Sequence, residues 1–414
     1  MAPPPGIHAR KAALRLLDAV LRRGETLDQA FGAATADLRR FEDKALARAI
    51  AAECLRWLND LDHAIDSATR QRLPGDAKAR MVLRLMLAQT WRLGTPAHAV
   101  IATGLPLLSA GPRRLAHGVF SHLTGTDGPQ LPAVPTLPAE VAARWGARAE
   151  AIAAGLADPP LLDLTLRDPA ETRRWQIELG ADTLAPGHLR LSRGENVEKL
   201  AGYADGAWWV QDLAASLPAR LLGEGGGRHV LDLCAAPGGK TMQLAAAGWK
   251  VTALDLSRRR LDVLKANLKR TGLNAGTIRA DALTWEPRHR FDAILIDAPC
   301  TATGTARRHP DVLHRIGTRH IEEATVLQRE LLGRAQHWLQ PGGRLVYAVC
   351  SLEEAEGAGI AGTCGLDPDP IDGGELPAGL EPDARGWLRT DPGMLPAAGG
   401  LDGFFIARFR APAG

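Results

Sequence analysis

Two cysteines follow apolar, strand-like segments in the second half of the chain. The segment "FDAILIDAPC" ends at Cys300, and "RLVYAVCS" contains Cys350. A thiolate is a strong nucleophile, although an unperturbed cysteine is ionised only to a small extent near neutral pH. Free cysteines are more often buried as small hydrophobic residues, as we expect for Cys54 and Cys364. Two thiols at the ends of two core strands raise the question of what chemistry such a pair would serve.

The region that contains both cysteines, residues 223–414, alternates strand-like and helix-like segments. Its continuous apolar strands predict a Rossmann-like α/β fold, in which a doubly wound, mostly parallel sheet is covered on both faces. The segment "GGLDGFFIARFRAP" is typical of a terminal hairpin arm. Ligands of such sheets bind beyond the carboxyl ends of the strands. Both cysteines occupy such ends, and so do four acidic residues: Asp232, Asp255, Asp281 and Asp297.

A glycine-rich turn, "DLCAAPGGKT", connects the first of these strands to a helix. It lacks the GxxxxGK[ST] spacing of a nucleotide P-loop and the GxGxxG spacing of nicotinamide enzymes. Gly238 and Gly239 would let the backbone come close to a small ligand at the helix N-terminus. Asp255 ends the next strand, where a carboxylate can accept both hydroxyls of a ribose. Turn and acid together predict a cofactor that contains a nucleoside.

The residues before the sheet form two further regions. Residues 1–127 carry apolar residues at three- and four-residue steps and no strand pattern, which predicts an all-helical domain. The Pro- and Gly-rich stretch "TGTDGPQLPAVPTLPAE" is typical of a linker. Residues 138–222 mix helical and strand-like segments and predict a small α+β connecting subdomain. The adjacent Trp208 and Trp209 should point to opposite faces of a strand and pack between subdomains.

Composition excludes several classes of protein. The chain has 414 residues, of which 45% are hydrophobic and 23% charged, as in ordinary globular proteins. No apolar run approaches the roughly 18 residues of a membrane helix, and the N-terminal residues lack the apolar core of a signal peptide. The five cysteines form no CxxC or CxxH pair. We therefore expect free thiols, no metal site, no membrane partner and a cytoplasmic location.

Charge is unevenly distributed along the chain. The net charge is +3, but residues 1–127 contain 18 Lys and Arg against 12 Asp and Glu. Residues 351–414 contain 4 against 11. A basic N-terminal part followed by a basic middle fits an anionic partner such as nucleic acid.

A set of motifs carries a resemblance to a known family. "DLCAAPGGKT", "ALDLS", "RADAL", "DAPCTATGTARRHPD" and "YAVCSLEEAEG" resemble, in order and spacing, the RNA cytosine-5 methyltransferases that use S-adenosylmethionine. The chain is most similar to the bacterial small-subunit ribosomal RNA cytosine-5 methyltransferase B family (RsmB/Sun/Fmu). The resemblance covers nearly the whole chain, and the helical N-terminal region resembles the NusB-like RNA-binding domain of that family. It implies formation of 5-methylcytidine in 16S ribosomal RNA.

The resemblance also implies roles for individual residues. Cys350 would be the nucleophile that adds to carbon 6 of cytosine, Cys300 would help to release the adduct, and Asp297 would contact ring nitrogen 3. Asp255 would hold the ribose of the cofactor, and Asp281 would lie beside the adenine. The expected S-adenosylmethionine site comprises Cys234, Ala235, Ala236, Pro237, Gly238, Gly239, Lys240, Asp255, Arg260, Asp281 and Asp297.

A basic segment, "TARRHPD", lies just beyond Cys300. Chemistry on a base requires the target nucleotide to leave its stack, and the segment next to such a site can grip the flanking phosphates. We therefore expect Arg307, Arg308 and His309 to contact RNA. The other expected partners are few: ribosomal RNA, no metal, and no second copy of the chain, which we expect to be a monomer.

The sequence departs from the family motif at the second cysteine. Val349 replaces the usual threonine, and the proline expected after the cysteine is missing from "EEAEG". A transfer RNA cytosine-5 methyltransferase would share every catalytic residue and is the main alternative. A DNA cytosine-5 methyltransferase would not need Cys350, and an exocyclic-amine methyltransferase would not carry "DAPC". A non-catalytic RNA-binding assembly factor could keep the fold but would not need the two cysteines.

Overall fold

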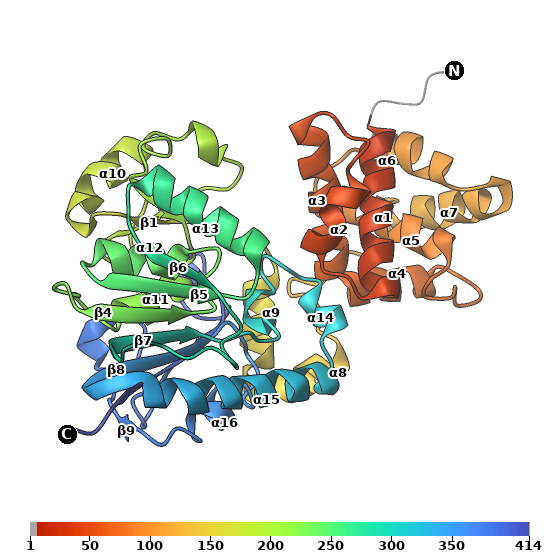
Figure 1. Cartoon of the computed structure of the whole chain (residues 1–414). Helices are drawn as coiled ribbons and strands as arrows, with labels where there is room; N and C mark the ends of the chain where they lie inside the picture. Colours follow the sequence, from red (N-terminus) through yellow and green to blue (C-terminus); the bar gives the residue numbers. More distant parts are fainter. Residues whose placement is uncertain (1–5, 414) are drawn as a thin grey trace. The chain divides into compact units, whose positions relative to one another are not determined.

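The computed structural model of this protein describes residues 6–413, so residues 1–5 of the predicted helical domain and Gly414 of the predicted catalytic domain lie outside it. The chain divides into two compact units (Figure 1). The helical unit comprises the residues up to Asp158 together with Ala306–Ile316. The sheet unit comprises Pro159–Thr305 together with the residues from Gly317 onward. The predicted boundaries at 127, 138 and 222 stay a prediction.

All regular elements described in the helical unit are helices, as the sequence predicts. They are α1 Ile7–Arg23, α2 Leu27–Ala34, α3 Phe41–Arg56, α4 Leu58–Ser67, α5 Lys78–Trp91, α6 Ala97–Gly104, α7 Ala110–Leu123, α8 Ala139–Trp145, α9 Ala149–Leu156 and α14 Val312–Arg315, with short 3-10 turns between some of them. Helix α1 shows why they pack, because Leu17 and Val20 from its apolar stripe lie in a core that also contains Cys54. Gly24 then ends the helix with a left-handed φ of 70°.

One segment of the helical unit comes from far along the sequence. Ala306–Ile316 follows the cysteine of "DAPC" by only a few residues, yet its contacts group it with the N-terminal helices. The Arg56 guanidinium donates to the Arg307 carbonyl at 2.8 Å. The ring nitrogen Nε2 of His314 lies 2.6 Å from the Leu55 carbonyl oxygen. The first contact uses a backbone carbonyl of the segment and the second a backbone carbonyl of α3, and together they attach the segment to that helix.

The sheet unit is built on one large sheet with the order β10-β11-β8-β7-β4-β5-β6. Its strands are β4 His229–Leu233, β5 Lys250–Asp255, β6 Gly276–Arg279, β7 Phe291–Asp297, β8 Leu339–Val349, β10 Leu388–Thr390 and β11 Phe404–Arg410, and β9 Asp367–Pro368 pairs with β11. Strands β4 to β8 run parallel, whereas β11 runs antiparallel to both of its neighbours. The predicted terminal hairpin arm is thus the β10–β11 pair.

Helices cover both faces of the large sheet, as expected for a doubly wound fold (Figure 1). The helices of this unit are α10 Thr172–Leu179, α11 Leu213–Arg220, α12 Gly239–Ala246, α13 Arg258–Thr271, α15 Thr318–Ala335 and α16 Ala358–Ala361. Leu331 and Leu332 of α15 pack in the same core as Ile294 of β7. Leu244 of α12 packs with Leu295 of β7 on the other face. Adjacent strand residues thereby bury both faces of the central strand.

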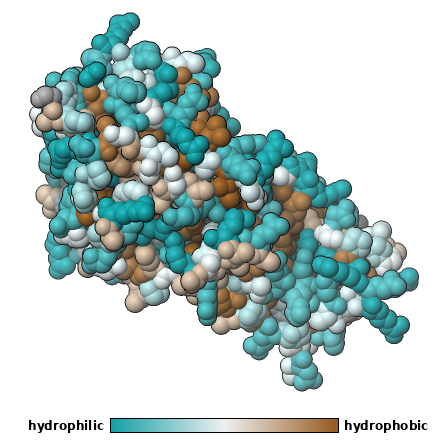
Figure 2. Space-filling view, turned by 90° about the horizontal axis from the view of Figure 1, so that it is seen from below, coloured by the Kyte–Doolittle hydropathy of each residue, from teal (hydrophilic) through white to brown (hydrophobic). Residues whose placement is uncertain are grey.

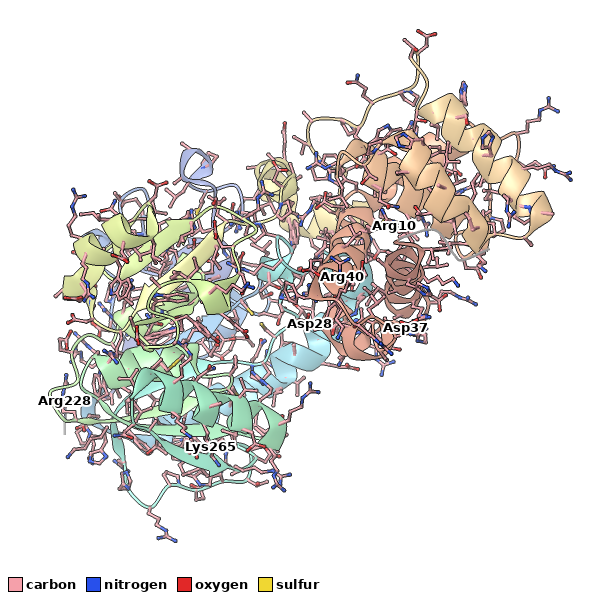
Figure 3. All side chains as sticks on the ribbon, turned by 90° about the horizontal axis from the view of Figure 1, so that it is seen from above. Arg10, Asp28, Asp37, Arg40, Arg228 and Lys265 are labelled. Carbon is pink, nitrogen blue, oxygen red and sulfur yellow. The ribbon has the colours of Figure 1, made fainter. Side chains whose placement is uncertain are left out.

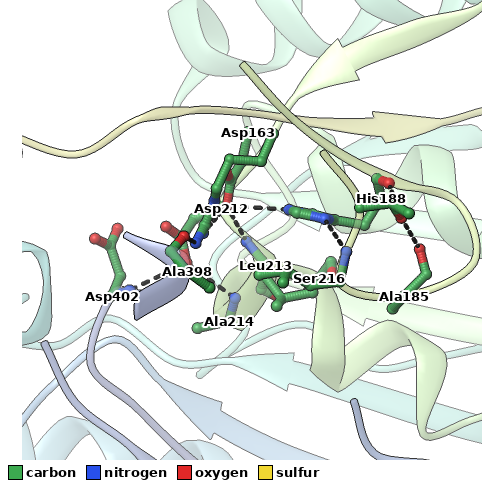
Figure 4. Close-up of polar contacts among 12 residues, drawn as sticks. Asp163, Ala185, His188, Asp212, Leu213, Ala214, Ser216, Ala398 and Asp402 are labelled. Carbon is green, nitrogen blue, oxygen red and sulfur yellow. Dashed lines mark hydrogen bonds and ion pairs between the residues drawn. The ribbon is translucent and has the colours of Figure 1, made fainter. Parts of the chain in front are cut away.

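A second, smaller sheet is fastened to the large domain by a buried carboxylate. It has the order β2-β1-β3, with β1 Leu162–Leu166, β2 His188–Leu191 and β3 Trp208–Val210. Asp163 accepts two hydrogen bonds of 2.7 Å from Arg190. It also accepts one of 3.0 Å from the Leu213 N–H (Figure 4). His188 Nε2 lies 3.2 Å from the same carboxylate. Because Arg190 also donates to the Ala398 carbonyl at 2.6 Å, the cluster connects β1, β2, α11 and the C-terminal segment.

The adjacent tryptophans pack on opposite sides of β3, as expected from the sequence, but of the two only Trp209 packs between the small sheet and the large domain. Trp208 lies in the core of the small sheet with Trp175. Trp209 packs in one core cluster with Ala235 and Ala236 of the glycine-rich turn, so it supports that turn. Both rings are buried, at 0% and 3% exposure.

The visible surface is predominantly hydrophilic. Figure 2 shows hydrophobic residues on its face only in small groups among hydrophilic ones. Among residues 6–413, no helix is long and apolar enough to cross a membrane.

Candidate active site

The glycine-rich turn joins the carboxyl end of β4 to the N-terminus of α12. Cys234 has a φ of 59°, and the bond between Ala236 and Pro237 is cis. Gly238 has a φ of 108° and stands immediately before α12. A side chain at this position would be strained by the backbone and would approach Leu264 to 2.8 Å. The turn therefore presents its backbone closely to whatever lies at the start of the helix.

Asp255 at the end of β5 holds this turn in place. Its carboxylate accepts from the Ala236 N–H at 3.1 Å and from the Ser257 N–H at 2.8 Å. Arg260 adds a second attachment, since it donates to the Ala236 carbonyl and lies 3.4 Å from the Asp255 carboxylate. A carboxylate offers about four acceptor positions, so Asp255 keeps capacity for two further donors such as ribose hydroxyls.

Asp232 is a further acid at this edge, one that sequence reasoning placed at a strand end but did not assign to the site. It is fully buried, and its Oδ2 accepts from the Thr241 hydroxyl at 2.5 Å. Its Oδ1 has no hydrogen-bond partner among the residues that the structure describes. Burial raises the pKa of Asp232 to about 7. An orphaned acid oxygen beside the turn suits a cationic donor such as the ammonium group of an amino acid.

Lys240 and Asp297 form an ion pair at the same edge. The ammonium nitrogen of Lys240, in the first turn of α12, lies 2.8 Å from the Asp297 carboxylate at the end of β7. Burial opposes the charge of Lys240, but the attraction and hydrogen bond to Asp297, together with attraction to Cys350, raise its pKa. The ammonium also lies over the Phe404 ring, 5.1 Å from its centroid. Lys240 is therefore held as a cation.

The two cysteines meet because their strands are parallel neighbours. Asp297 of β7 is in register with Ala348 of β8, and both strands end within two residues of that pair. The chain after β7 then returns to β8, where the Gly304 N–H donates to the Cys350 carbonyl at 3.0 Å. The Sγ atoms of Cys300 and Cys350 lie 3.4 Å apart. At this distance the two sulfur atoms are in contact, and both cysteines are free thiols.

Gly304 makes the close return of the chain possible. A Cβ at this position would lie 1.9 Å from the Gly403 carbonyl oxygen and 2.9 Å from that of Cys350. Any larger residue would push the Cys300 segment away from β8. The glycine in "ATGTA" is thus a steric requirement for the thiol pair.

The surroundings of Cys300 and of Cys234 raise the pKa of both thiols. The hydrogen bond with Cys350, burial and the negative charge of Glu356 raise the pKa of Cys300 well above its usual value. Cys300 is therefore a protonated thiol near neutral pH. Burial likewise raises the pKa of Cys234 to about 12, so this cysteine shapes the turn and is no nucleophile at neutral pH.

The remaining predicted residues lie in two other places. Asp281 stands exposed beyond the end of β6 and accepts from the Leu283 N–H at 2.9 Å. The basic segment belongs to the helical unit, where Arg307 is buried and Arg308 is half-buried. His309 lies 3.6 Å from the Asp28 carboxylate, and burial lowers its pKa. Contact of these three residues with RNA stays a prediction.

Among residues 6–413, no cluster of His, Cys, Asp and Glu is arranged to hold a metal ion. The site therefore consists of an acid-lined turn suited to a small nucleoside ligand, an ion pair and two thiols in contact. All of these groups lie at the carboxyl edge of β4, β5, β7 and β8, where such sheets bind ligands.

Two family models match the chain. The family described as "16S rRNA methyltransferase RsmB/F" matches residues 219–410, and the NusB family matches residues 7–108. The second match confirms the predicted NusB-like character of the helical N-terminal region.

Curated relatives extend the match to nearly the full length. The chain is 35% identical to ribosomal RNA small subunit methyltransferase B of Xanthomonas campestris pv. campestris, over 85% of this chain and 86% of that protein. It is 33% identical to the protein of the same name from Pseudomonas syringae pv. tomato, over 97% of this chain and 96% of that protein.

Solved structures share the fold. The crystal structure of PH0851 covers 99% of both chains with a TM-score of 0.72 and 23% identity. A methyltransferase homologue from Pyrococcus horikoshii has a TM-score of 0.56 and 26% identity over 66% of this chain and 93% of its own.

These matches confirm the Rossmann-like methyltransferase fold and the cofactor expected from the sequence. S-Adenosylmethionine fits the residues present, since Asp255 keeps capacity for ribose hydroxyls and Asp232 offers an unpartnered oxygen to an ammonium group. The protein is thus an S-adenosylmethionine-dependent RNA methyltransferase. The identity of about a third over almost its whole length shows that the chain belongs to the ribosomal RNA small subunit methyltransferase B family.

Proposed function

We propose that this protein methylates carbon 5 of cytosine in 16S ribosomal RNA through a covalent cysteine adduct. The observation that carries the proposal is the pair of thiols, Cys300 and Cys350, with Sγ atoms 3.4 Å apart. Beside them stands the Lys240–Asp297 ion pair. A methyltransferase that acts on an exocyclic amine needs no thiol, whereas carbon 5 of cytosine needs a nucleophile to activate it.

Cys350 is the proposed nucleophile. Carbon 5 of cytosine is too weak a nucleophile to take a methyl group. When the Cys350 thiolate adds to carbon 6, a sulfur–carbon bond forms and electron density moves to carbon 5. Asp297 contacts ring nitrogen 3 as charge develops there, and Lys240 keeps Asp297 in place. S-Adenosylmethionine, when bound, supplies an electrophilic methyl group.

Cys300 is the proposed release residue. Release of the product requires the proton on carbon 5 to pass to solvent, the ring double bond to form again and the bond between sulfur and carbon 6 to break. Cys300 keeps its proton because its pKa is raised. From 3.4 Å it can donate a hydrogen bond to the departing sulfur. A second thiol therefore has a task that a single cysteine could not perform.

The helical unit is proposed to bind the RNA. Helix α7 presents exposed basic residues, including Arg114. Around α2 the charge is more balanced, since Asp28 and Asp37 pair with Arg48 and Arg15 at 2.6 Å and 3.0 Å. Figure 3 shows both acids on this unit, near Arg40. Phosphate contacts from such a surface would position the RNA without reading its sequence.

The names of the relatives favour ribosomal RNA over the alternative of transfer RNA. The test is to incubate the purified protein with labelled S-adenosylmethionine and either 16S ribosomal RNA or bulk transfer RNA, and then to separate the nucleosides. We expect label in 5-methylcytidine from the ribosomal RNA. Label in N4-methylcytidine or in a uridine product would overturn the chemistry, and label mainly in transfer RNA would overturn the substrate. Absence of transfer to either RNA would favour a non-catalytic assembly factor.

A further inference from the structure

A buried carboxylate lies behind the two thiols. Glu356 is 0% exposed, and its two oxygens accept four hydrogen bonds. Oε1 accepts from the hydroxyls of Ser351, at 2.8 Å, and of Thr301. Oε2 accepts from the Thr301 N–H and from the Gln328 side-chain amide, each at 2.9 Å. The carboxylate is therefore fully used by neutral donors.

Three of the four hydrogen bonds come from the residues that directly follow the cysteines. Thr301 follows Cys300 in the chain, and Ser351 follows Cys350. Gln328 of α15 also donates to the carbonyl of Pro299, the residue before Cys300, at 2.9 Å. Glu356 thus connects three parts of the fold: the segment that carries Cys300, the end of β8 that carries Cys350, and helix α15.

The absence of a compensating cation is unusual. Among residues 6–413, no Lys, Arg or His lies within ion-pair distance of the Glu356 carboxylate. A buried carboxylate is normally paired with a cation, because its transfer from water is costly. Here four hydrogen bonds from neutral donors satisfy its two oxygens instead. A negative charge buried beside a thiol without a cation disfavours ionisation of that thiol.

We propose that Glu356 is a positioning residue that holds Cys300 against Cys350 and places a fixed negative charge behind Cys300. The inference rests on the proposed two-thiol mechanism. Geometry carries it, since removal of Glu356 would free Thr301 and Ser351 together. The charge has a second effect, because Glu356 is one of the causes of the raised pKa of Cys300, after the Cys350 hydrogen bond and burial.

Two substitutions separate geometry from charge. In Glu356→Gln, the amide NH₂ can occupy the Oε1 position, because the hydroxyls of Ser351 and Thr301 can turn and accept instead of donating. The oxygen then keeps the Oε2 position. This variant preserves the contacts and removes the charge, whereas Glu356→Ala removes both. Glu354→Gln is the matched control, since Glu354 is an exposed neighbour that forms an ion pair with Arg389, at 2.8 Å.

The distance between the thiols can be measured without RNA or cofactor. Diamide takes two hydrogens from the thiols and is reduced to the hydrazine, while Cys300 and Cys350 form a disulfide that peptide mass spectrometry identifies. We expect rapid disulfide formation in the wild type, in Glu354→Gln and in Glu356→Gln, and formation at least tenfold slower in Glu356→Ala. Wild-type oxidation of Glu356→Ala would overturn the positioning role, whatever the protein methylates.

Turnover tests the catalytic consequence. We expect both Glu356 variants to lower kcat by about tenfold or more while KM for RNA and for S-adenosylmethionine stays the same. Gln328→Ala, which loses the donor to Glu356 and Pro299, is a milder variant should Glu356→Ala fold poorly, and it should slow oxidation in the same direction. If the wild type forms 5-methylcytidine and Glu356→Gln, Glu356→Ala and Gln328→Ala all keep its kcat, the catalytic role of Glu356 is wrong while the proposed function stands. If the wild type forms none, only the proposed function fails.

Discussion

Asp255 offers a sharp test of the cofactor site. In the structure, its two carboxylate oxygens each accept one backbone N–H, from Ala236 and from Ser257. Replacement by asparagine removes the charge and places an NH₂ group against one of these N–H donors. The change therefore weakens both the proposed ribose contact and the attachment of the glycine-rich turn.

The expected loss follows from the hydrogen bonds. A hydrogen bond to a charged group contributes about 1.5–3 kcal/mol. At 1.4 kcal/mol for each factor of ten, Asp255→Asn should raise the Kd for S-adenosylmethionine by roughly 10- to 100-fold. Asp255→Ala should cost at least as much, because it leaves the buried Ala236 N–H without an acceptor.

Isothermal titration calorimetry of S-adenosylmethionine against the full chain measures this change directly. Asp262→Asn is the matched control, since Asp262 is an exposed acid on α13, beside the site but outside it. Thermal unfolding of each variant checks that the fold is kept. An Asp255→Asn variant with wild-type affinity would show that Asp255 only caps the turn and would remove it from the cofactor site.

Three further predictions concern stability and RNA. Because burial raises the pKa of Asp232 to about 7 from its usual 3.8, its stabilising contribution is full below about pH 4 and is lost as pH rises through 7. Between pH 5 and 9, the melting temperature of Asp232→Asn should therefore fall less steeply with pH than that of the wild type. Parallel curves of melting temperature against pH would contradict this. Arg190→Met removes both guanidinium hydrogen bonds from buried Asp163 and should cost roughly 3–5 kcal/mol in urea unfolding, whereas a loss below about 1 kcal/mol would count against the cluster. Arg114→Gln should reduce the log–log salt slope of RNA binding by about 0.7, and an unchanged slope would exclude Arg114 from the RNA contacts.

The sequence predicts the large sheet and its carboxyl edge well. Continuous apolar strands and interrupting glycines are local signals, and the acids and cysteines follow directly after those strands. Register then brings Cys300 and Cys350 together, since Asp297 and Ala348 are paired neighbours. The Trp208–Trp209 pair was also predictable, because alternation along a strand is local.

Long-range pairing explains what the sequence does not reveal. Nothing in "TARRHPD" indicates that its backbone is held by Arg56, which lies 251 positions earlier. The Glu356 cluster likewise depends on Thr301, 55 positions away, and a glutamate in "EEAEG" has the appearance of a solvated surface residue. The free oxygen of Asp232 depends on the exact fit of buried groups. Such features follow from tertiary packing, which no local motif records.

Covalent trapping tests the central claim about the two thiols most directly. Each variant, Cys300→Ala and Cys350→Ala, is incubated with 16S ribosomal RNA and S-adenosylmethionine and then examined by denaturing electrophoresis. We expect Cys300→Ala to stall as a covalent protein–RNA complex that requires both RNA and cofactor, and Cys350→Ala to form no complex and to transfer no methyl group. The opposite result, a complex with Cys350→Ala and none with Cys300→Ala, would assign the nucleophile to Cys300 and contradict the account.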